Sequence, residues 1–365
     1  MAAKIESLKI EGYLSIRHAK VGLRALNLLI GANGSGKSNF VSALEMLGRI
    51  VDEDLALYVG RRGGAAALRY RGPGPSDRIR LELDFPPDGY RADLVSAAGD
   101  EFVFADEMVR HIVSEEDREG WNGWLGRGHR ETRLHRQEPG QYAVPGRLIE
   151  VLRGCRVFHF HDTGADAAVK QKADPAQNSR LLADAGNLAP FLRRIRDEQP
   201  SAYERIRSTV RQVAPFFRDF VLEEEQRKMR LRWRQFGVDG EFGADALSDG
   251  TLRFICLSTL LLQPEPPSLV VLDEPELGLH PYAIVVLADL LRSASSRCQL
   301  VAATQSVSLA NQFGIEDLVV VERSDGGSTF ARRSEDDLAA WLEDFSTGDL
   351  WEKNLLGGRP RREQQ

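Results

Sequence analysis

The sequence contains no apolar run of the roughly 18 to 20 residues that a membrane-spanning helix requires. Its longest candidates, 254–262 and 268–272, are short enough to be buried elements of a globular core. Cysteine is scarce, and Cys155, Cys256 and Cys298 have spacings that suit neither a zinc site nor a disulfide framework. The start, MAAKIESLKI, lacks the charged and apolar regions of a secretory signal. We therefore expect a cytoplasmic protein that contacts no membrane.

Excess positive charge is also missing. The formal net charge is −6, which argues against a protein that coats nucleic acid through its overall field, although local basic surfaces remain possible. Hydrophobic residues make up 42% of the chain and charged residues 28%, which is ample for a buried core. A length of 365 residues favours two domains, or one domain with a large insertion.

Two stretches of alternating strands and helices flank a region of mixed content. The alternation predicts a parallel α/β sheet with crossover connections. The predicted parts are a first α/β part in 1–100, an insertion or coupling lobe in 101–240, a second α/β part in 241–335 and a tail in 336–365. Within them we expect strands at 25–30, 79–85, 228–236, 269–272 and 299–303 and a helix at 201–213, opened by Ser201 and Glu204 in capping-box spacing.

The strongest local signal is the segment 31–38, which reads G-x-x-x-x-G-K-S between an apolar strand and an amphipathic helix. That context identifies a Walker A loop, whose backbone N–H groups and helix N-terminus bind phosphates. Lys37 would supply a mobile charge, and the Ser38 hydroxyl suits Mg²⁺. The alternative is a glycine-rich turn with a chance lysine. The candidate nucleotide-binding residues are Asn33, Gly34, Ser35, Gly36, Lys37, Ser38 and Asn39.

A second signal is the apolar strand 269–272, which ends in Asp273 and Glu274. Open α/β sheets bind their ligands at the carboxyl ends of strands. Asp273 would hold Mg²⁺, and Glu274 would orient or deprotonate the attacking water. The alternative is an ordinary solvated strand end.

The third signal is the segment 247–251, Leu-Ser-Asp-Gly-Thr, followed by an apolar helix. Small residues at a helix start can approach a γ-phosphate with backbone N–H groups and a serine hydroxyl. Ser248 and Gly250 are therefore candidates for a second phosphate clamp. An isolated pentapeptide of this kind would usually be a plain helix N-cap.

Taken in order, these segments resemble ABC-type ATPases of the RecF, SMC and OLD group, and closely the small stand-alone RecF-like ATPases. The matching stretches are GANGSGKSNF, HFHDT, LSDGTLRFICLSTLLLQP, LVVLDEPELGLHP and ATQS. The resemblance implies an α/β fold: a P-loop NTPase head with a mixed-sheet lobe and a parallel core sheet flanked by helices on both faces. It also implies ATP hydrolysis with Mg²⁺ in a head-to-tail homodimer, in which Ser248 and Gly250 reach the nucleotide of the other subunit.

The same resemblance makes 276–281 the D-loop and puts Gln305 where many ABC ATPases carry a switch histidine. Glutamine cannot act as a charged acid or base, but its amide can hydrogen-bond the γ-phosphate or the lytic water. We therefore expect slow hydrolysis with Glu274 and Gln305 as the catalytic residues. Asp249 and Thr251 replace the residues of transporter signatures, which favours the RecF-like branch.

Three weaker features carry open alternatives. His159 and His161, with Asp162 after them, form either a metal pair or a structural element. The cations at 228, 230, 232 and 234 alternate along a predicted strand and would bind a phosphate backbone or pair with Glu223–Glu225. The segment 118–136, with Trp121 and Trp124, would stack on bases or dock a partner.

The cargo is open. By resemblance, the leading function is ATP-driven repair or anti-phage defence on DNA or with a DNA-directed partner. A second reading is a nucleotide-gated scaffold that controls a separate effector, such as a nuclease or toxin. A third makes the insertion itself a metal-dependent nuclease through His159, His161 and Asp162. OLD-type relatives carry a nuclease domain after the ATPase, but only about 60 residues follow Gln305, so we expect any nuclease to be a separate polypeptide.

Overall fold

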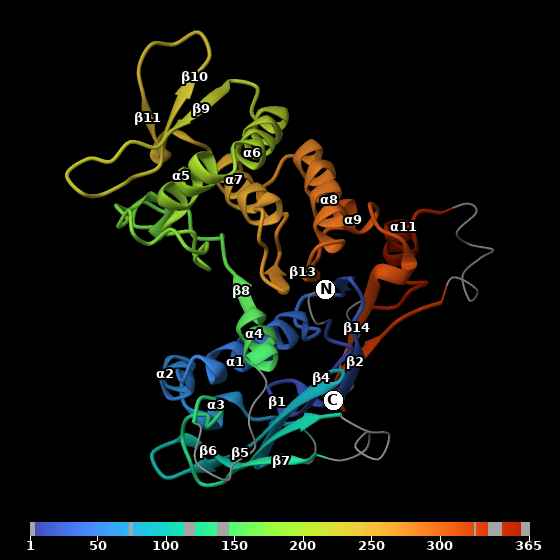
Figure 1. Ribbon diagram of the computed structural model, residues 1–365. Helices are drawn as coiled ribbons and strands as arrows, with labels where there is room; N and C mark the ends of the chain where they lie inside the picture. The colour runs from blue at the N-terminus through green and yellow to red at the C-terminus, as the bar shows by residue number, and fades with distance from the viewer. Residues whose placement is uncertain are drawn as a thin grey trace. The chain divides into compact units, whose positions relative to one another are not determined.

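The computed structural model describes residues 4–72, 76–112, 121–136, 146–324, 326–334 and 345–358. The chain divides into two compact units, each assembled from segments that are distant in sequence (Figure 1). Unit 1 comprises Met1–Val157, Ser268–Val271 and Cys298–Gln365, and unit 2 comprises Phe158–Pro267 and Leu272–Arg297.

Unit 1 contains a six-stranded antiparallel sheet with the order β2-β1-β4-β5-β6-β7. Its strands are β1 Ser7–Tyr13, β2 Ile16–Gly22, β4 Arg78–Phe85, β5 Asp88–Ala97, β6 Glu101–His111 and β7 Gly123–Gly126. Strands β4 to β7 lie side by side in Figure 1. The alternation predicted at 79–85 is confirmed in β4, where every second side chain is buried.

A second six-stranded sheet has the order β15-β14-β3-β13-β12-β8. Its strands are β3 Leu26–Ile30, β8 Arg156–Phe158, β12 Leu269–Asp273, β13 Gln299–Thr304, β14 Leu318–Ser324 and β15 Gly327–Ala331. All five residues of β3 are buried, and β3 runs parallel to both β13 and β14. Buried, continuously apolar strands are typical of parallel sheets, and the strands predicted at 25–30, 269–272 and 299–303 are confirmed.

Helix α1, Lys37–Val51, packs against β1 of the antiparallel sheet and β13 of the parallel sheet. Its buried Phe40, Leu44 and Leu47 belong to one hydrophobic core together with residues of both sheets and of α4. The other helices of unit 1 are α2 Leu55–Arg61, α3 Ala65–Leu68, α4 Gly146–Gly154, α9 Val307–Ala310, the 3₁₀ turn η4 Ile315–Asp317 and α11 Thr347–Glu352. Because α1 packs against strands of both sheets, the C-terminal end of the loop that precedes it is fixed in position.

Unit 2 combines four helices with a small antiparallel sheet of order β11-β10-β9. The helices are α5 Leu188–Glu198, α6 Pro200–Val213, α7 Asp249–Leu262 and α8 Pro281–Ser295, with 3₁₀ turns η2 Ala168–Lys170 and η3 Ala244–Ala246. The strands are β9 Phe217–Val221, β10 Arg232–Gln235 and β11 Phe242–Gly243.

Two predictions for unit 2 need correction. Helix α6 begins at Pro200 behind the N-cap Gln199, which makes no side-chain cap bond, so the capping box of Ser201 and Glu204 is wrong. Proline at the first helical position presets the helical φ angle and shifts the start by one residue. The strand predicted at 228–236 is shorter than expected, because β10 spans only Arg232–Gln235.

Cys155, Cys256 and Cys298 are free and buried. Burial raises the pKa of the Cys155 and Cys256 thiols to about 12, so both thiols stay protonated at neutral pH. Within the described ranges, no helix is both long enough and apolar enough to cross a membrane.

We predict that Gly48→Ala destabilises the protein. A Cβ at Gly48 of α1 would lie 2.4 Å from the carbonyl oxygen of Cys155, so the helix would have to move away from its neighbour. Such overpacking costs roughly 1–3 kcal/mol. Urea denaturation of Gly48→Ala should show this loss in the free energy of unfolding.

The matched control is Gly60→Ala in α2, where an added Cβ meets nothing within 4 Å. Alanine is the better helix former by about 0.8–1 kcal/mol, so this variant should be at least as stable as the parent. Equal stability of the two variants would contradict the assigned packing of α1.

Candidate nucleotide-binding site

The loop 31–36 joins β3 to α1 with a backbone that requires glycine. Gly34 has a φ of +74° and Gly36, the N-cap of α1, a φ of +114°, and both values lie where side chains are strained. The N-terminus of α1 has no side-chain cap and no acidic residue in its first turn. Its N–H groups and the positive end of the helix dipole therefore suit an anion.

A serine network holds this loop from behind. The Ser328 hydroxyl on β15 donates to the carbonyl of Ser35 (2.6 Å) and lies 2.6 Å from the Ser15 hydroxyl. The amide nitrogen of Asn39 donates to the Ser15 hydroxyl (2.6 Å). A Cβ at Gly36 would lie 2.1 Å from Ser328 Oγ, so a glycine is needed at this position. The network fixes the loop in one conformation.

Lys37 is buried at the start of α1. Its ammonium donates to the carbonyls of Gly31 (2.7 Å) and Ala32 (3.0 Å). Asn33, Gly34 and Ser38 are exposed, so the predicted phosphate-binding surface is open to solvent.

The loop also contacts a segment near the C-terminus that the sequence analysis did not assign. The N–H of Ala32 donates to the carbonyl of Gly358 (2.8 Å), and the N–H of Gly358 donates to Glu322 (2.9 Å). Nearby, α11 packs against α9, where the Thr347 hydroxyl donates to the carbonyl of Phe313 (2.8 Å). The segment 346–358 therefore links the start of the loop to the helix that follows Gln305.

Gln305 lies directly after β13, and Gly31 lies directly after β3. The two strands are parallel neighbours in which Thr304 pairs with Ile30, so both residues emerge at the same edge of the sheet. Gln305 is exposed. The structure thus brings the predicted switch residue and the Walker A loop together.

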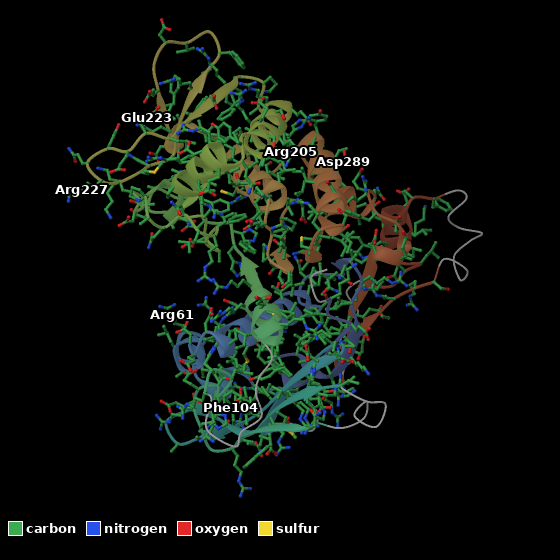
Figure 2. All side chains as sticks on the ribbon, viewed as in Figure 1. Arg61, Phe104, Arg205, Glu223, Arg227 and Asp289 are labelled. Carbon is green, nitrogen blue, oxygen red and sulfur yellow. The ribbon has the colours of Figure 1, made fainter. Side chains whose placement is uncertain are left out.

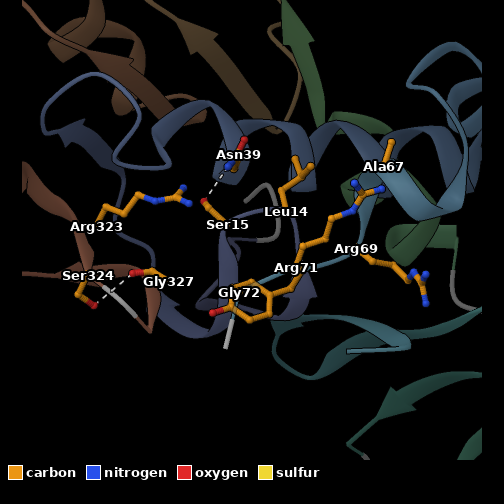
Figure 3. Close-up of a pocket in the computed structure, with 11 residues that line it drawn as sticks. Leu14, Ser15, Asn39, Ala67, Arg69, Arg71, Gly72, Arg323, Ser324 and Gly327 are labelled. Carbon is orange, nitrogen blue, oxygen red and sulfur yellow. Dashed lines mark hydrogen bonds between the residues drawn. The ribbon is translucent and has the colours of Figure 1, made fainter. Parts of the chain in front are cut away.

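A cavity of about 630 Å³ opens beside the loop (Figure 3). Ser15 and Asn39 lie in its centre, with Arg323 at one end and Arg69 and Arg71 at the other. Its lining is completed by Leu14, Ala67, Tyr70, Gly72, Ser324 and Gly327. The volume lies within the range of small-molecule sites, and the cationic lining favours an anionic ligand.

Strand β12 ends at Asp273, in the segment of unit 2 that begins at Leu272, and is followed by a tight turn. Glu274 has a φ of +44°, a conformation that costs a residue with a side chain roughly 1–3 kcal/mol. The carbonyl of Glu274 accepts from the N–H of Leu277 (3.1 Å), which closes the turn. Backbone strain of this kind is concentrated at functional sites, and Glu274 is the residue predicted to be the catalytic base.

Ser248 is the N-cap of α7, and its hydroxyl accepts from the N–H of Thr251 (3.2 Å). The plain N-cap role is therefore present in this structure. A Cβ at Gly250 would lie 2.4 Å from the carbonyl oxygen of Gly278, so this glycine permits close contact between the turn and the predicted D-loop. That contact gives Gly250 a structural reason independent of any phosphate.

The histidine pair does not lie on a strand, because β8 ends at Phe158. The rings of His159 and His161 are 6.5 Å apart, and the Asp162 carboxylate accepts from the N–H of Gly164 (3.0 Å). In the part of the chain that the structure describes, no group of three or more His, Cys, Asp or Glu side chains could hold a metal ion.

The four cations at 228–234 are all neutralised by neighbours. The pairs are Lys228 with Asp174 (3.7 Å), Arg230 with Asp245 (2.7 Å), Arg232 with Glu225 (2.9 Å) and Glu241 (2.5 Å), and Arg234 with Glu241 (2.8 Å). The predicted pairing with Glu223–Glu225 holds for Glu225 alone, and Figure 2 shows Glu223 in the connection between β9 and β10. Paired cations in this arrangement indicate a solvated face.

Of the predicted segment 118–136, residues 118–120 lie outside the described residues. Trp121 is already covered, since the guanidinium groups of Arg91 and Arg110 lie 5.0 and 5.2 Å from its ring centroid. Trp124 is 56% exposed and donates to Asp106 (3.3 Å). One of the two tryptophans is therefore open to a partner.

Comparisons with known proteins agree with these features. A family model described as "AAA domain, putative AbiEii toxin, Type IV TA system" matches residues 26–311. The SmcHead bound to the C-winged helix domain of ScpA has a similar structure, with a TM-score of 0.61 at 14% identity over 92% of this chain and 99% of that chain. No curated protein matches the chain significantly.

Two further Smc heads also have similar structures. The head with an extended coiled coil from Pyrococcus furiosus, bound to the C-terminal domain of ScpA, has a TM-score of 0.60 at 14% identity over 93% of this chain and 98% of that chain. The head with a coiled coil and joint from Pyrococcus yayanosii has a TM-score of 0.54 at 12% identity over 93% of this chain and 99% of that chain. At such identities the likeness shows the fold alone, and it confirms the predicted α/β fold of a P-loop ABC-type head.

We predict that Ser328→Ala weakens nucleotide binding about tenfold, since a lost bond to a buried carbonyl costs roughly 1–2 kcal/mol and frees the loop to leave its binding conformation. Isothermal titration calorimetry with ATP measures the change. Thr329→Ala is the control, because this neighbouring hydroxyl is exposed and donates to the Glu322 carbonyl at 3.4 Å. Equal ATP affinity of both variants would show that the serine network does not position the loop.

Proposed function

Because the chain belongs to the family of AAA domains described as putative AbiEii toxins of type IV toxin–antitoxin systems, we propose that it binds and hydrolyses ATP as an ABC-type ATPase. The observation that carries this proposal is the uncapped N-terminus of α1 behind a glycine loop locked by Ser328. An uncapped helix N-terminus offers N–H donors that a polyphosphate satisfies.

The residues of the loop suit a nucleotide with Mg²⁺. The backbone of Asn33 to Asn39 would surround the β- and γ-phosphates, and Lys37 would exchange its two loop carbonyls for phosphate oxygens. The exposed Ser38 hydroxyl and the Asp273 carboxylate are oxygen donors of the kind that Mg²⁺ prefers. When bound, Mg²⁺ neutralises charge on the phosphates.

The cavity beside the loop would receive the rest of the nucleotide. Asn39 links the glycine loop to the cavity, since it lies in the first turn of α1 directly after Ser38 and also lines the cavity. We propose that the ribose and base lie between Arg323 and the pair Arg69 and Arg71, near Tyr70. Arginine side chains can stack on a base or bind ribose oxygens.

Glu274 would accept a proton from the attacking water. A carboxylate at the end of a buried strand is held at a fixed point, and its strained backbone indicates that the turn is built around it. The Gln305 amide would hydrogen-bond the water or the γ-phosphate, a role that leaves proton transfer to Glu274.

We propose that Ser248 and Gly250 act on the nucleotide of a second copy, in a head-to-tail homodimer. Three large apolar side chains of unit 2 are exposed: Leu277 (47%), Tyr282 (53%) and Val285 (40%). Tyr282 and Val285 have a spacing of three on α8, so they share one helix face. Burial of this face against another copy would supply apolar contact area.

A second candidate function is that ATP-dependent dimerisation regulates a separate effector. The family's description, which names a toxin and a toxin–antitoxin system, favours this role. Direct action on DNA, in repair or anti-phage defence, has less support on the surface predicted for it, since all four cations at 228–234 are paired with carboxylates. A DNA-directed partner would suit either role.

We predict that Glu274→Gln retains ATP binding, loses at least a hundredfold in kcat and accumulates the ATP-bound dimer, because removing a general base typically costs 10²–10⁴-fold. Lys37→Ala should lose both binding and dimerisation. Phosphate release and light scattering with ATP measure these effects. Glu265→Gln, an exposed carboxylate of the same unit, is the control. Hydrolysis by Glu274→Gln at the parent rate would show that the catalytic assignment is wrong.

A further inference from the structure

Arg253 lies one turn into α7, after the Ser248–Thr251 segment. Its Nη1 atom donates to the carbonyl of Leu277 (2.8 Å), and its Nη2 atom donates to the carbonyl of His161 (2.7 Å). The guanidinium is planar and permanently charged, so it fixes the distance and direction between the two acceptors. Arg253 therefore joins α7 to two segments that are distant in sequence.

The first acceptor belongs to the turn that contains Glu274. The N–H of Leu277 donates to the Glu274 carbonyl (3.1 Å), and the carbonyl of the same Leu277 accepts from Arg253. Glu274 is held at a φ of +44°. A strained conformation persists only where surrounding contacts enforce it, and the bond from Arg253 is one such contact.

Glycine 278 makes room for this contact. A Cβ at Gly278 would lie 2.7 Å from Nη1 of Arg253, and a Cβ at Gly250 would lie 2.4 Å from the Gly278 carbonyl oxygen. The start of α7 thus touches the D-loop at two adjacent points, one through Gly250 and one through Arg253. Because of these two contacts, a movement of the Ser248–Gly250 turn would displace the residues that follow Glu274.

The second acceptor, the His161 carbonyl, belongs to the HFHDT segment, to which the proposed nucleotide site assigns no role. Arg253, His161, Asp273 and Glu274 line a cavity of about 10 Å³, which is about the volume that one water molecule needs. The walls are completed by Phe158, Phe160, Leu257, Leu272 and Pro275. The bond to the His161 carbonyl holds this wall in place beside the carboxylates.

We propose that Arg253 is a positioning residue: it holds Glu274 in the conformation needed for hydrolysis and couples that conformation to the Ser248–Gly250 clamp. This inference rests on the proposed ATPase function. Through Arg253, engagement of the clamp by nucleotide would set the catalytic carboxylate. The role of the HFHDT segment is then structural, through its backbone and its cavity wall.

The test compares Arg253→Met with Arg297→Met. Arg297 makes the same kind of contact at the other end of the helix, where it donates to the carbonyls of Leu261 and Gln263, so it is a matched control. Both variants lose two bonds to backbone carbonyls. ATP turnover, ATP affinity and thermal unfolding are measured for the parent and for both variants.

We expect Arg253→Met to lower kcat about ten- to a hundredfold, as small misplacements of a catalytic group do, while ATP affinity changes less than about twofold. Arg297→Met should lower Tm by a similar amount and leave kcat within about twofold. In the Glu274→Gln background, Arg253→Met should cause no further loss of kcat, because both changes act on the same step.

Two results would overturn the proposal while the parent hydrolyses ATP: an unchanged kcat in Arg253→Met, or an equal loss of kcat in both arginine variants. The second result would assign the effect to general destabilisation. A parent protein that releases no phosphate above background would overturn the proposed function and the role of Arg253 together.

Discussion

The hydrogen bond from Ser328 to the Ser35 carbonyl is the interaction on which the site in unit 1 depends. It fixes the backbone of the glycine loop, and the loop in turn aims the N–H groups of α1 at one point. Helix α1 cannot shift to relax the loop, because it packs against strands of two sheets. Backbone donors that are already in place would need no rearrangement to meet a phosphate, which would lower the cost of the proposed nucleotide binding.

In unit 2, the position of Glu274 is fixed in a different way. Glu274 has a backbone conformation that is unfavourable in isolation, and hydrogen bonds from Leu277 and Arg253 stabilise the turn around it. The glycines at 250 and 278 allow the helix start and the turn to approach at backbone distance.

The local parts of the site could be predicted from sequence, because their signals are local. The loop 31–38 and the two carboxylates at the end of β12 each combine a strand end with residues of fixed type, and the structure puts Gln305 at the sheet edge expected for it. Ser328 and Gly358 could not be predicted, since they reach the loop from about 300 residues away and make their contacts through folding alone.

Other differences have particular physical causes. Pro200 overrides the polar residues that suggested a capping box, because its ring fixes the helix start. The alternating cations at 228–234 looked like a phosphate track because sequence alone does not show that Glu241 and Asp245 return to neutralise them. The HFHDT histidines offered a metal pair as one alternative, but they follow the end of β8, and the carbonyl of His161 is bound by Arg253.

The central claim is that one triphosphate is gripped by the loop of one copy and the serine–glycine turn of another. Complementation tests it most directly: Lys37→Ala and Ser248→Arg chains, each inactive alone, are mixed in equal amounts. If the site is shared, only mixed dimers carry an intact site, one of two, so ATP turnover should recover to about a quarter of the parent value with random pairing and to about half if only mixed dimers form. A mixture that stays as inactive as its components, although mixed dimers are detected, would contradict the shared site.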